Sequence, residues 1–293
     1  RNLRVDTGHL VNTQGRIEHA GSGTLTLQSG TIDASQGLIA TTANADIQAG
    51  AFTHDGATLQ ASQLSLQAHA ASNRGGDIAV SGTEAARLTV SNGLDNTGGS
   101  LAANGRLEVS AGSITNAQGS MTALETLAVQ SNGRLDNVGG ELAAGGSVQL
   151  DAAEISNTQG WVQASGDLDV RAGRLINSGH MVAGGDVEIR AAQVQAAATS
   201  MIAAGVRTDG GVPASADTGH LTITASDRLA SQGRQMAAGQ VRLEGASIDL
   251  TGGLTTAQHI EMRSTGTIVT DRATVSTSGR LTIGGRGEAP AAA

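Results

Sequence analysis

Apolar and polar residues alternate along the chain in a pattern that returns about every twenty residues. The clearest unit is the sequence LDNVGGELAA, from Leu135 to Ala144. The same layout returns around Asn96, Asn116, Asn157 and Asn177, so that these asparagines and Asn137 lie 20 or 21 residues apart. We take the asparagine as the mark position of each unit. A fixed period of this length predicts a repeat architecture in which each unit packs on its neighbours.

Other positions keep the same phase when the marks are extended through Ala34, His54, Ala197 and Ser231. The residue five places after the mark is apolar in twelve of thirteen units, where 39% hydrophobic content predicts about five; Val182 and Met236 are examples. A third element is an apolar-x-apolar triplet, as in Leu168 and Val170. Such alternation is typical of a strand with one buried face.

Glycines separate these short strands and provide the tight corners between them. Because a short strand cannot bury its apolar face alone, the pattern predicts an all-β parallel β-helix, or solenoid, of about thirteen coils with a repeat of roughly 20 residues. The glycine content and the alternating triplets disfavour a helical solenoid. The asparagines at 96, 116, 137, 157 and 177 would then stack as a structural ladder of side-chain amides.

Composition narrows the function classes. The chain has 293 residues, no Cys, no Lys, 1% aromatic residues and a net charge of -8. The lack of Cys excludes disulfides and Cys-based metal or redox sites. The negative charge disfavours nucleic acid as a partner. No apolar run approaches the ~20 residues of a membrane span, so the chain is not expected to span a membrane.

The units LDNVGGELAA and LDNTGGSLAA, the latter beginning at Leu94, resemble the haemagglutinin repeat of filamentous haemagglutinin and related two-partner-secreted exoproteins. These relatives include the long sticks of contact-dependent inhibition systems. The resemblance implies a right-handed β-helix, export through an outer-membrane transporter, and a location outside a Gram-negative cell or on its surface. It also implies a role in adhesion or toxin presentation. Since no Asn-Pro-Asn motif or signal peptide is present, we expect an internal fragment of a longer exoprotein.

The expected organisation has four parts: β-helix coils over 1–205, a loop insertion over 206–220, further coils over 221–283, and a flexible tail over 284–293. The insertion arises because the spacing from Ala197 to Ser231 is 34 residues. A loop leaving a rigid scaffold is a common place for binding function. Its candidate interaction residues are Arg207, Asp209, Pro213 and Asp217. The alternative is an insertion that is tolerated because a longer loop costs little entropy.

Four carboxylates fall on outward positions of two adjacent coils, at Asp167, Asp169, Asp186 and Glu188. Like charges on paired strands repel, so something must offset them. A hard cation such as Ca²⁺ would do so, and a carboxylate pair for glycoside hydrolysis is a further alternative. The interpretation we favour is a solvated face on which Arg171 and Arg190 are the partners. The seven histidines are expected at surface or corner positions, without a zinc motif.

We therefore predict a non-enzymatic shaft of a secreted adhesin that mediates cell attachment as an extended rod, with no cofactor. Its partners would be a host or bacterial cell-surface receptor, either protein or glycan, and the outer-membrane transporter during export. One alternative is the stalk of a contact-dependent growth inhibition toxin-delivery exoprotein. Another is a polysaccharide-active β-helix enzyme, although long loops and aromatics are scarce. An ice-binding solenoid would need a longer array of threonines than Thr24, Thr26, Thr222 and Thr224 provide.

Overall fold

The computed structural model describes residues 1–206, 218–285 and 291–292. They form an all-β parallel solenoid of about 14 turns with a repeat near 20 residues and no helix, which confirms the predicted fold class. The thirteen predicted coils correspond to the thirteen mark positions, and the fourteenth long strand follows the last of these marks. The handedness stays a prediction. The chain divides into two compact units, Arg1–Gly145 and Gly146–Ala293, and each is described by itself.

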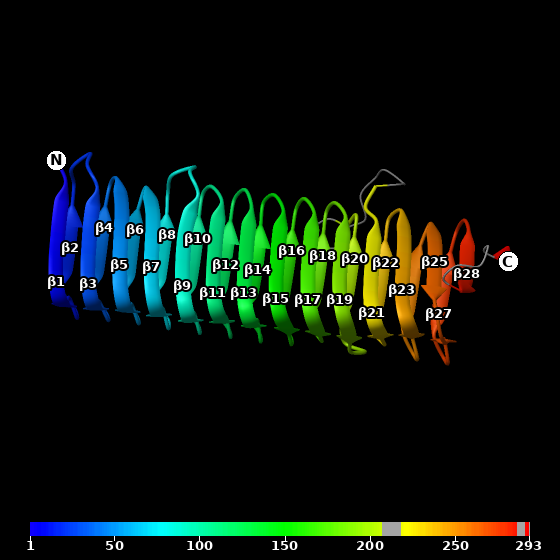
Figure 1. The fold of residues 1–293 in the computed structure, drawn as a ribbon. Coiled ribbons are helices and arrows are strands. Elements are labelled where there is room, and N and C mark those ends of the chain that lie inside the picture. Colours follow the sequence, from blue (N-terminus) through cyan, green and yellow to red (C-terminus); the bar gives the residue numbers. More distant parts are fainter. Residues whose placement is uncertain (207–217, 286–290, 293) are drawn as a thin grey trace. The chain divides into compact units, whose positions relative to one another are not determined.

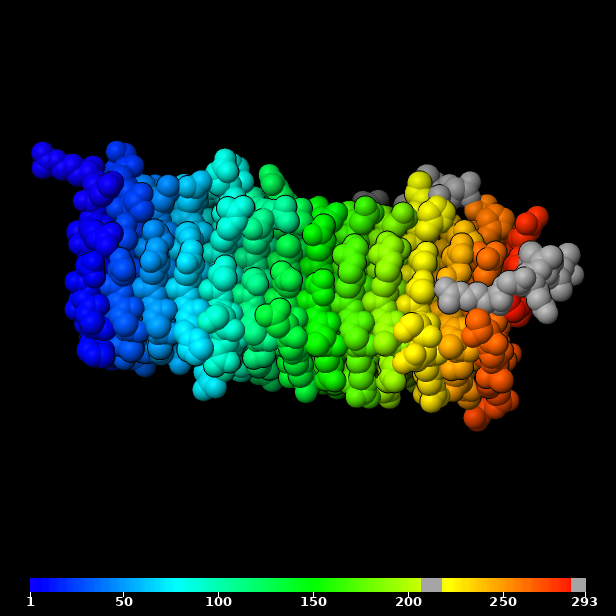
Figure 2. All heavy atoms as spheres, viewed as in Figure 1, coloured from blue at the N-terminus to red at the C-terminus, as the bar shows by residue number. Residues whose placement is uncertain are grey.

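Each turn of the first unit consists of a long strand and a short strand, and each strand pairs in parallel with its counterpart in the next turn (Figure 1). In Figure 2 these turns are successive bands from blue to green. The long strands are β1 (Leu3–Val11), β3 (Leu25–Asp33), β5 (Asn44–Thr53), β7 (Gln63–Ser72), β9 (Ala86–Asp95), β11 (Leu107–Thr115) and β13 (Leu127–Asp136). The short strands are β2 (Arg16–His19), β4 (Leu38–Thr41), β6 (Thr58–Ala61), β8 (Asp77–Val80), β10 (Ser100–Ala103), β12 (Ser120–Ala123) and β14 (Glu141–Ala144).

The second unit repeats the same plan. Its long strands are β15 (Val148–Asn157), β17 (Leu168–Asn177), β19 (Val187–Ala196), β21 (Leu221–Ser231), β23 (Gln240–Asp249), β25 (His259–Ser264) and β28 (Leu281–Gly285). Its short strands are β16 (Trp161–Ala164), β18 (His180–Ala183), β20 (Met201–Ala204), β22 (Arg234–Ala237), β24 (Leu254–Ala257) and β27 (Thr274–Thr277). Two further strands are β26 (Ile268–Val269), which pairs with β23, and β29 (Ala291–Ala292), which pairs antiparallel with β28.

The core consists of columns of aliphatic side chains that run from turn to turn. One column of the first unit joins Leu27, Ile47, Leu66, Leu88 and Val109, which are register partners and at most 2% exposed. Burying such a side chain contributes about 1.5–3 kcal/mol relative to leaving it in water. Since each turn covers the apolar face of the next, a narrow core of Leu, Ile, Val and Ala is sufficient.

The corner after each long strand explains the recurring glycines. Two residues after the mark the backbone takes a positive φ, as at Gly98 (62°) and Gly139 (61°), and Gln118 takes it in the turn between them (55°). One residue further, a Cβ atom on Gly119 would lie 2.1 Å from the carbonyl oxygen of Asn96. Any side chain at that position would collide with the backbone of the preceding turn. The second glycine of the repeat is therefore required by close approach.

The register corrects the predicted phase in the second unit. Asn177 pairs with Ala196, so the mark lies at Ala196 and not at Ala197. The corner after Asn177 is one residue shorter than the corner after Asn157, because β18 begins three residues after its mark and β16 begins four after its own. A constant spacing of 20 residues cannot represent this deletion.

The shortened corner after Asn177, and a second one after Ser231, where β22 also begins three residues after the mark, change which residues point inward. Met181, not Val182, pairs with Val162 in the core, and Gln235, not Met236, follows Ile202. Val182 is instead buried in an outer apolar cluster with Ala203 and Val206, against which Met201 and Met236 pack. This small second core lies on β18, β20 and β22.

The predicted loop and tail are described only at their edges. β20 ends at Ala204 and β21 begins at Leu221, and residues 207–217 between them lie outside the described residues. The candidate interaction residues Arg207, Asp209, Pro213 and Asp217 fall in that range, so their role stays a prediction. β29 lies within the predicted tail over 284–293, whose flexibility likewise stays a prediction.

Candidate functional site

A ladder of buried asparagines runs inside the corners of the first unit. The Nδ2 atom of each asparagine donates to the Oδ1 atom of the next, at 2.8 Å from Asn73 to Asn96, 2.7 Å from Asn96 to Asn116 and 2.8 Å from Asn116 to Asn137. Each Nδ2 also lies 3.2 Å from backbone carbonyl oxygens of its own corner and of the next turn. The amides satisfy the corner carbonyls where no water reaches. The ladder is a structural element.

The second unit contains a shorter form of this ladder. Asn157 donates to Asn177 at 2.9 Å, and the next mark position is occupied by Ala196. The Nδ2 atom of Asn177 has no hydrogen-bond partner among the described residues. Further along, Ser231, Gln235 and Thr255 form a buried polar group: Gln235 donates to the Ser231 hydroxyl and accepts from the Thr255 hydroxyl at 3.0 Å. The sequence analysis missed this group, because the residue five places after Ser231 was assigned to the core and its register lies one residue earlier.

His54 occupies a corner, one of the two kinds of position expected for the histidines, but it is not exposed there. Its side chain is fully buried and stands at the mark position, where other turns have asparagine. Its Nδ1 atom is 2.7 Å from Asn73 Oδ1, which accepts because the Asn73 amide nitrogen donates onward to Asn96. His54 is therefore the first donor of the ladder. Burial lowers its pKa, since the charged ring would lose water, although the hydrogen bond to Asn73 and the nearby Asp55 and Asp77 act in the opposite direction.

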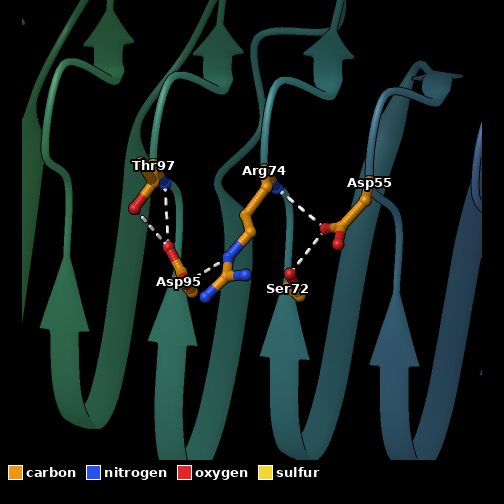
Figure 3. A network of polar contacts seen from close by, with 5 residues as sticks. All are labelled: Asp55, Ser72, Arg74, Asp95 and Thr97. Carbon is orange, nitrogen blue, oxygen red and sulfur yellow. Dashed lines mark hydrogen bonds and ion pairs between the residues drawn. The ribbon is translucent and has the colours of Figure 1, made fainter.

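On the outer side of the same corners, aspartates hold the chain where it leaves the long strands. Figure 3 shows Arg74 between two of them: its backbone N–H donates to Asp55 at 2.9 Å and its Nε to Asp95 at 2.6 Å. Asp95 also accepts from the amide and hydroxyl of Thr97, at 3.0 and 2.6 Å. Partial burial opposes ionisation of Asp95, but these hydrogen bonds outweigh it and lower its pKa.

The same aspartate turn occurs in both units. Asp33 accepts from the amide and hydroxyl of Ser35, and Asp249 from those of Thr251. In both cases the hydrogen bonds lower the pKa of the aspartate. The sequence signal for this turn is Asp-x-Ser/Thr in which the aspartate is the last residue of a long strand.

The structure divides the four carboxylates singled out from the sequence into two pairs. Asp169 and Glu188 are register partners on β17 and β19, while Asp167 and Asp186 precede those strands. Asp167 Oδ1 accepts from the backbone N–H of Asp186 at 2.9 Å, and Asp186 Oδ1 accepts from that of His220 at 2.8 Å. Asp167 and Asp186 therefore cap the backbone of the next turn.

Asp169 and Glu188 are paired with arginines on their own strands. Arg171 lies 2.8 Å from Asp169, Arg190 lies 3.8 Å from Asp169, and Arg190 also forms an ion pair with Glu188. Within the described ranges, no group of three or more His, Cys, Asp or Glu side chains is arranged to hold a metal ion. The geometry therefore favours a charged face with arginine partners over a cation site.

Two features of the second unit were not foreseen. The backbone caps continue past Asp186, since His220 Nδ1 accepts from the Gln240 N–H at 3.1 Å and His259 Nδ1 from that of Arg280 at 3.0 Å. In addition, Trp161 and His180 stack with ring centroids 4.1 Å apart and planes 10° from parallel. Both residues begin short strands and are register partners, a relation visible only once the register is known.

Comparison with known proteins identifies the repeat. The family model described as haemagglutinin repeat matches residues 1–98, 83–139 and 136–287, which is nearly the whole chain. The chain belongs to the haemagglutinin-repeat family. This haemagglutinin-repeat chain is also 29% identical over 209 residues to a Yersinia pestis protein named Toxin CdiA. The match covers 70% of the chain but only 6% of that relative, so the chain spans a small part of its length. No solved structure matches it.

Proposed function

We propose that this haemagglutinin-repeat chain is an internal shaft segment of a large exoprotein that is secreted to the surface of a Gram-negative bacterium and mediates cell attachment. The observation that carries the proposal is the repetition of one inward layout from turn to turn. Each turn adds an Asn or its substitute at the mark position, one aliphatic side chain to each of two inward columns, and a tight corner. Residues that repeat in this way add length at about 4.8 Å per turn instead of enclosing a reaction site.

Export through an outer-membrane two-partner transporter agrees with the composition. The chain has no Cys, so no disulfide loop would hinder passage of the unfolded chain through a pore. Each turn contacts mainly its neighbours, which allows turn-by-turn folding as the chain emerges. Among the residues the structure describes, no helix is long and apolar enough to cross a membrane.

A structural role agrees better with the polar groups than catalysis does. Asp169 and Glu188 lie against Arg171 and Arg190, and the ionised carboxylates at 33, 95 and 249 are fixed by turn hydrogen bonds. A glycosidase needs a carboxylic acid whose pKa is raised so that it can donate a proton. The shifts at Asp33, Asp95 and Asp249 are all downward.

A second candidate is the stalk of a contact-dependent inhibition exoprotein, in which the shaft presents a toxin instead of an adhesive surface. The relative named Toxin CdiA favours this alternative. The physical role of the segment would be the same, namely to hold a distant part of the parent protein away from the cell that displays it.

The test uses deletions in the parent protein that keep or break the register. Removing residues 97–137 deletes two whole turns and joins Asn96 to Val138-Gly139-Gly140, which restores the corner sequence Asn-x-Gly-Gly. Removing residues 97–106 leaves half a turn and breaks the register. We expect the first deletion to keep surface display and attachment to epithelial cells and red cells, and the second to abolish display.

Purified chain should also compete with attachment by the displaying bacterium. Failure to compete, together with undiminished attachment by a parent lacking all 293 residues, would overturn the attachment role. If that same deletion abolished killing of neighbouring bacteria in co-culture, the stalk of a toxin-delivery protein would be the correct function.

A further inference from the structure

The long strands of the first unit carry a groove on their outer face that a shaft does not need. The groove has a volume of about 610 Å³ and extends across β1, β3, β5, β7 and β9. Its lining includes Gln28, Gln48 and Gln67, together with Ala49, Ala68 and His69. All of these residues belong to one unit, so its shape is set by five consecutive turns.

The glutamines form a column with the spacing of the strands. Gln28 pairs in register with Gln48, and Gln48 with Gln67, so neighbouring side chains start about 4.8 Å apart. Gln28 accepts from Arg4 at 2.7 Å. The described residues provide no hydrogen-bond partner to the exposed amides of Gln48 and Gln67. Each of these amides has a donor and an acceptor available to a ligand.

The lining has little charge to recognise a charged polymer. Asp6 is paired with Arg4 at 3.1 Å, and the His69 ring is hydrogen-bonded to the Ser91 hydroxyl at 3.0 Å. The remaining lining side chains are amides, hydroxyls and small residues, without a large apolar group to anchor a protein partner. Strands β3, β5 and β7 are paired on both sides, so they have no free edge for an added strand.

The spacing of the amides further restricts the ligand. An extended peptide advances by about 3.3 Å per residue and would lose step with groups repeating every 4.8 Å or so. A chain of pyranose sugars advances by close to one strand spacing per ring, and its hydroxyls both donate and accept hydrogen bonds. We infer that this groove binds a neutral, linear polysaccharide lying along the turns, with about one sugar ring per turn. This inference rests on the proposed attachment role, for which it names a ligand class.

The experiment measures binding of cellohexaose, laminarihexaose and maltohexaose to the purified chain by calorimetry. Glucose serves as the length control and heparin as the charged control. We expect one hexasaccharide to bind at least tenfold more tightly than glucose, since it reaches across several turns. The double variant Gln48→Ala/Gln67→Ala should weaken that binding at least fivefold. The matched control is Gln130→Ala, which belongs to the same outward column but lies outside the groove.

Three results would overturn the inference. The first is that no hexasaccharide binds, and the second is that the double variant and the Gln130→Ala control bind equally well. Preferred binding of heparin would also overturn it, because the ligand would then be a polyanion. Circular dichroism checks that the variants fold. If a parent protein with both substitutions still attaches to cells, the groove is not part of the attachment surface. The shaft role would be unaffected by that result. If the wild-type parent failed to attach to cells in every assay, the proposed function itself would be refuted.

Discussion

The two units share one backbone plan but satisfy their buried corners differently. In the first unit the mark column contains Asn73, Asn96, Asn116 and Asn137, joined by amide hydrogen bonds after His54. In the second unit the column passes from Asn177 to Ala196, Ser231 and Leu250, all at most 1% exposed. The corner after Leu250 still has a positive φ at Gly252 (70°). The corner therefore requires a backbone conformation and a filled position, and asparagine is only one way to fill it.

The outer faces differ as well. Neutral residues dominate the outward register column of the first unit that contains Gln28, Gln48 and Gln67. The equivalent column of the second unit carries charged residues, among them Arg171, Arg190 and Glu244. Outward residues vary in this way because they contribute little to packing. They are free to carry a binding surface in one region and charge pairs in another.

The largest effect should come from the close approach at the second glycine of the corner. Gly119→Ala places a Cβ 2.1 Å from the Asn96 carbonyl oxygen and should destabilise by about 3 kcal/mol. In the second unit, Gly253→Ala brings its Cβ 2.8 Å from the Ser231 carbonyl oxygen and should cost less. Thermal unfolding followed by circular dichroism measures both. Gly93→Ala, with only an ordinary contact at 3.4 Å, is the control; an equal loss in all three would contradict the steric account.

The next effect concerns the ladder. Asn116→Ala removes the two ladder hydrogen bonds to Asn96 and Asn137, and also the bonds from its own amide to buried carbonyl oxygens, which should cost roughly 3 kcal/mol. Asn177→Ala removes one ladder bond, from Asn157, so the loss should be about half as large. Urea unfolding of the two variants compares the interior of a ladder with its end. Equal losses would mean that cavity formation, not hydrogen bonding, determines the cost.

His54 should make the first unit sensitive to acid. Because burial lowers its pKa in the folded state, the unfolded chain binds a proton first as the pH falls below the ordinary value near 6.5. The neutral ring therefore stabilises above that pH, and this stability is lost as the pH falls toward the folded pKa. The melting temperature of the wild type should decrease between pH 7.5 and 5.5, with aspartates still ionised.

A variant that completes the ladder tests this dependence. Ala34→Asn/His54→Asn places asparagine at both mark positions and should remove most of the slope of melting temperature against pH. His69→Asn, which changes an exposed histidine, should leave the slope as it is. An unchanged slope in the double variant would assign the acid sensitivity to other groups.

The smallest effects should lie on the outer faces. Arg242 is paired with Glu244 at 3.0 Å and with Glu261 at 3.6 Å, and both carboxylates are largely buried. Arg242→Gln should cost about 1 kcal/mol, and less at high salt. Gln48→Ala in the first unit should cost less than about 0.5 kcal/mol. Fluorescence of Trp161, the only tryptophan in the chain, measures unfolding of the second unit for Arg242→Gln, and circular dichroism measures unfolding for Gln48→Ala. A larger loss from Gln48→Ala would show that the glutamine column is structural.

Much of the fold could be predicted from the sequence because inward positions repeat. The pairs Leu94 with Ile114 and Ile114 with Leu135 follow from the phase of their asparagines, and the register pairs them in this way. The prediction failed where the repeat loses a residue, at the corners after Asn177 and Ser231. Ala196, Met181 and Gln235 took positions that constant spacing had given to their neighbours. A constant repeat length cannot show where a single residue is missing, whereas the hydrogen-bond register between strands identifies the partner of each residue.

The candidate site was less predictable than the fold. The sequence placed four carboxylates on one face, but their roles depend on which groups lie within hydrogen-bonding distance. Asp167 and Asp186 contact the backbone of the next turn, whereas Asp169 and Glu188 contact arginines. It also gave no sign that His54 is buried, since a histidine among polar neighbours usually lies at the surface.

The sequence by itself determined the number of residues per turn, the inward columns, the tight corners and the family, because these depend on local periodicity and on residue size. Only the tertiary structure decided which polar side chains become partners. The contacts between turns join residues about twenty positions apart, or 34 apart for Asp186 and His220. Whether Gln48 faces solvent or Asp186 caps His220 depends on the exact register of adjacent turns. A shift of one residue moves a side chain to the opposite face of its strand.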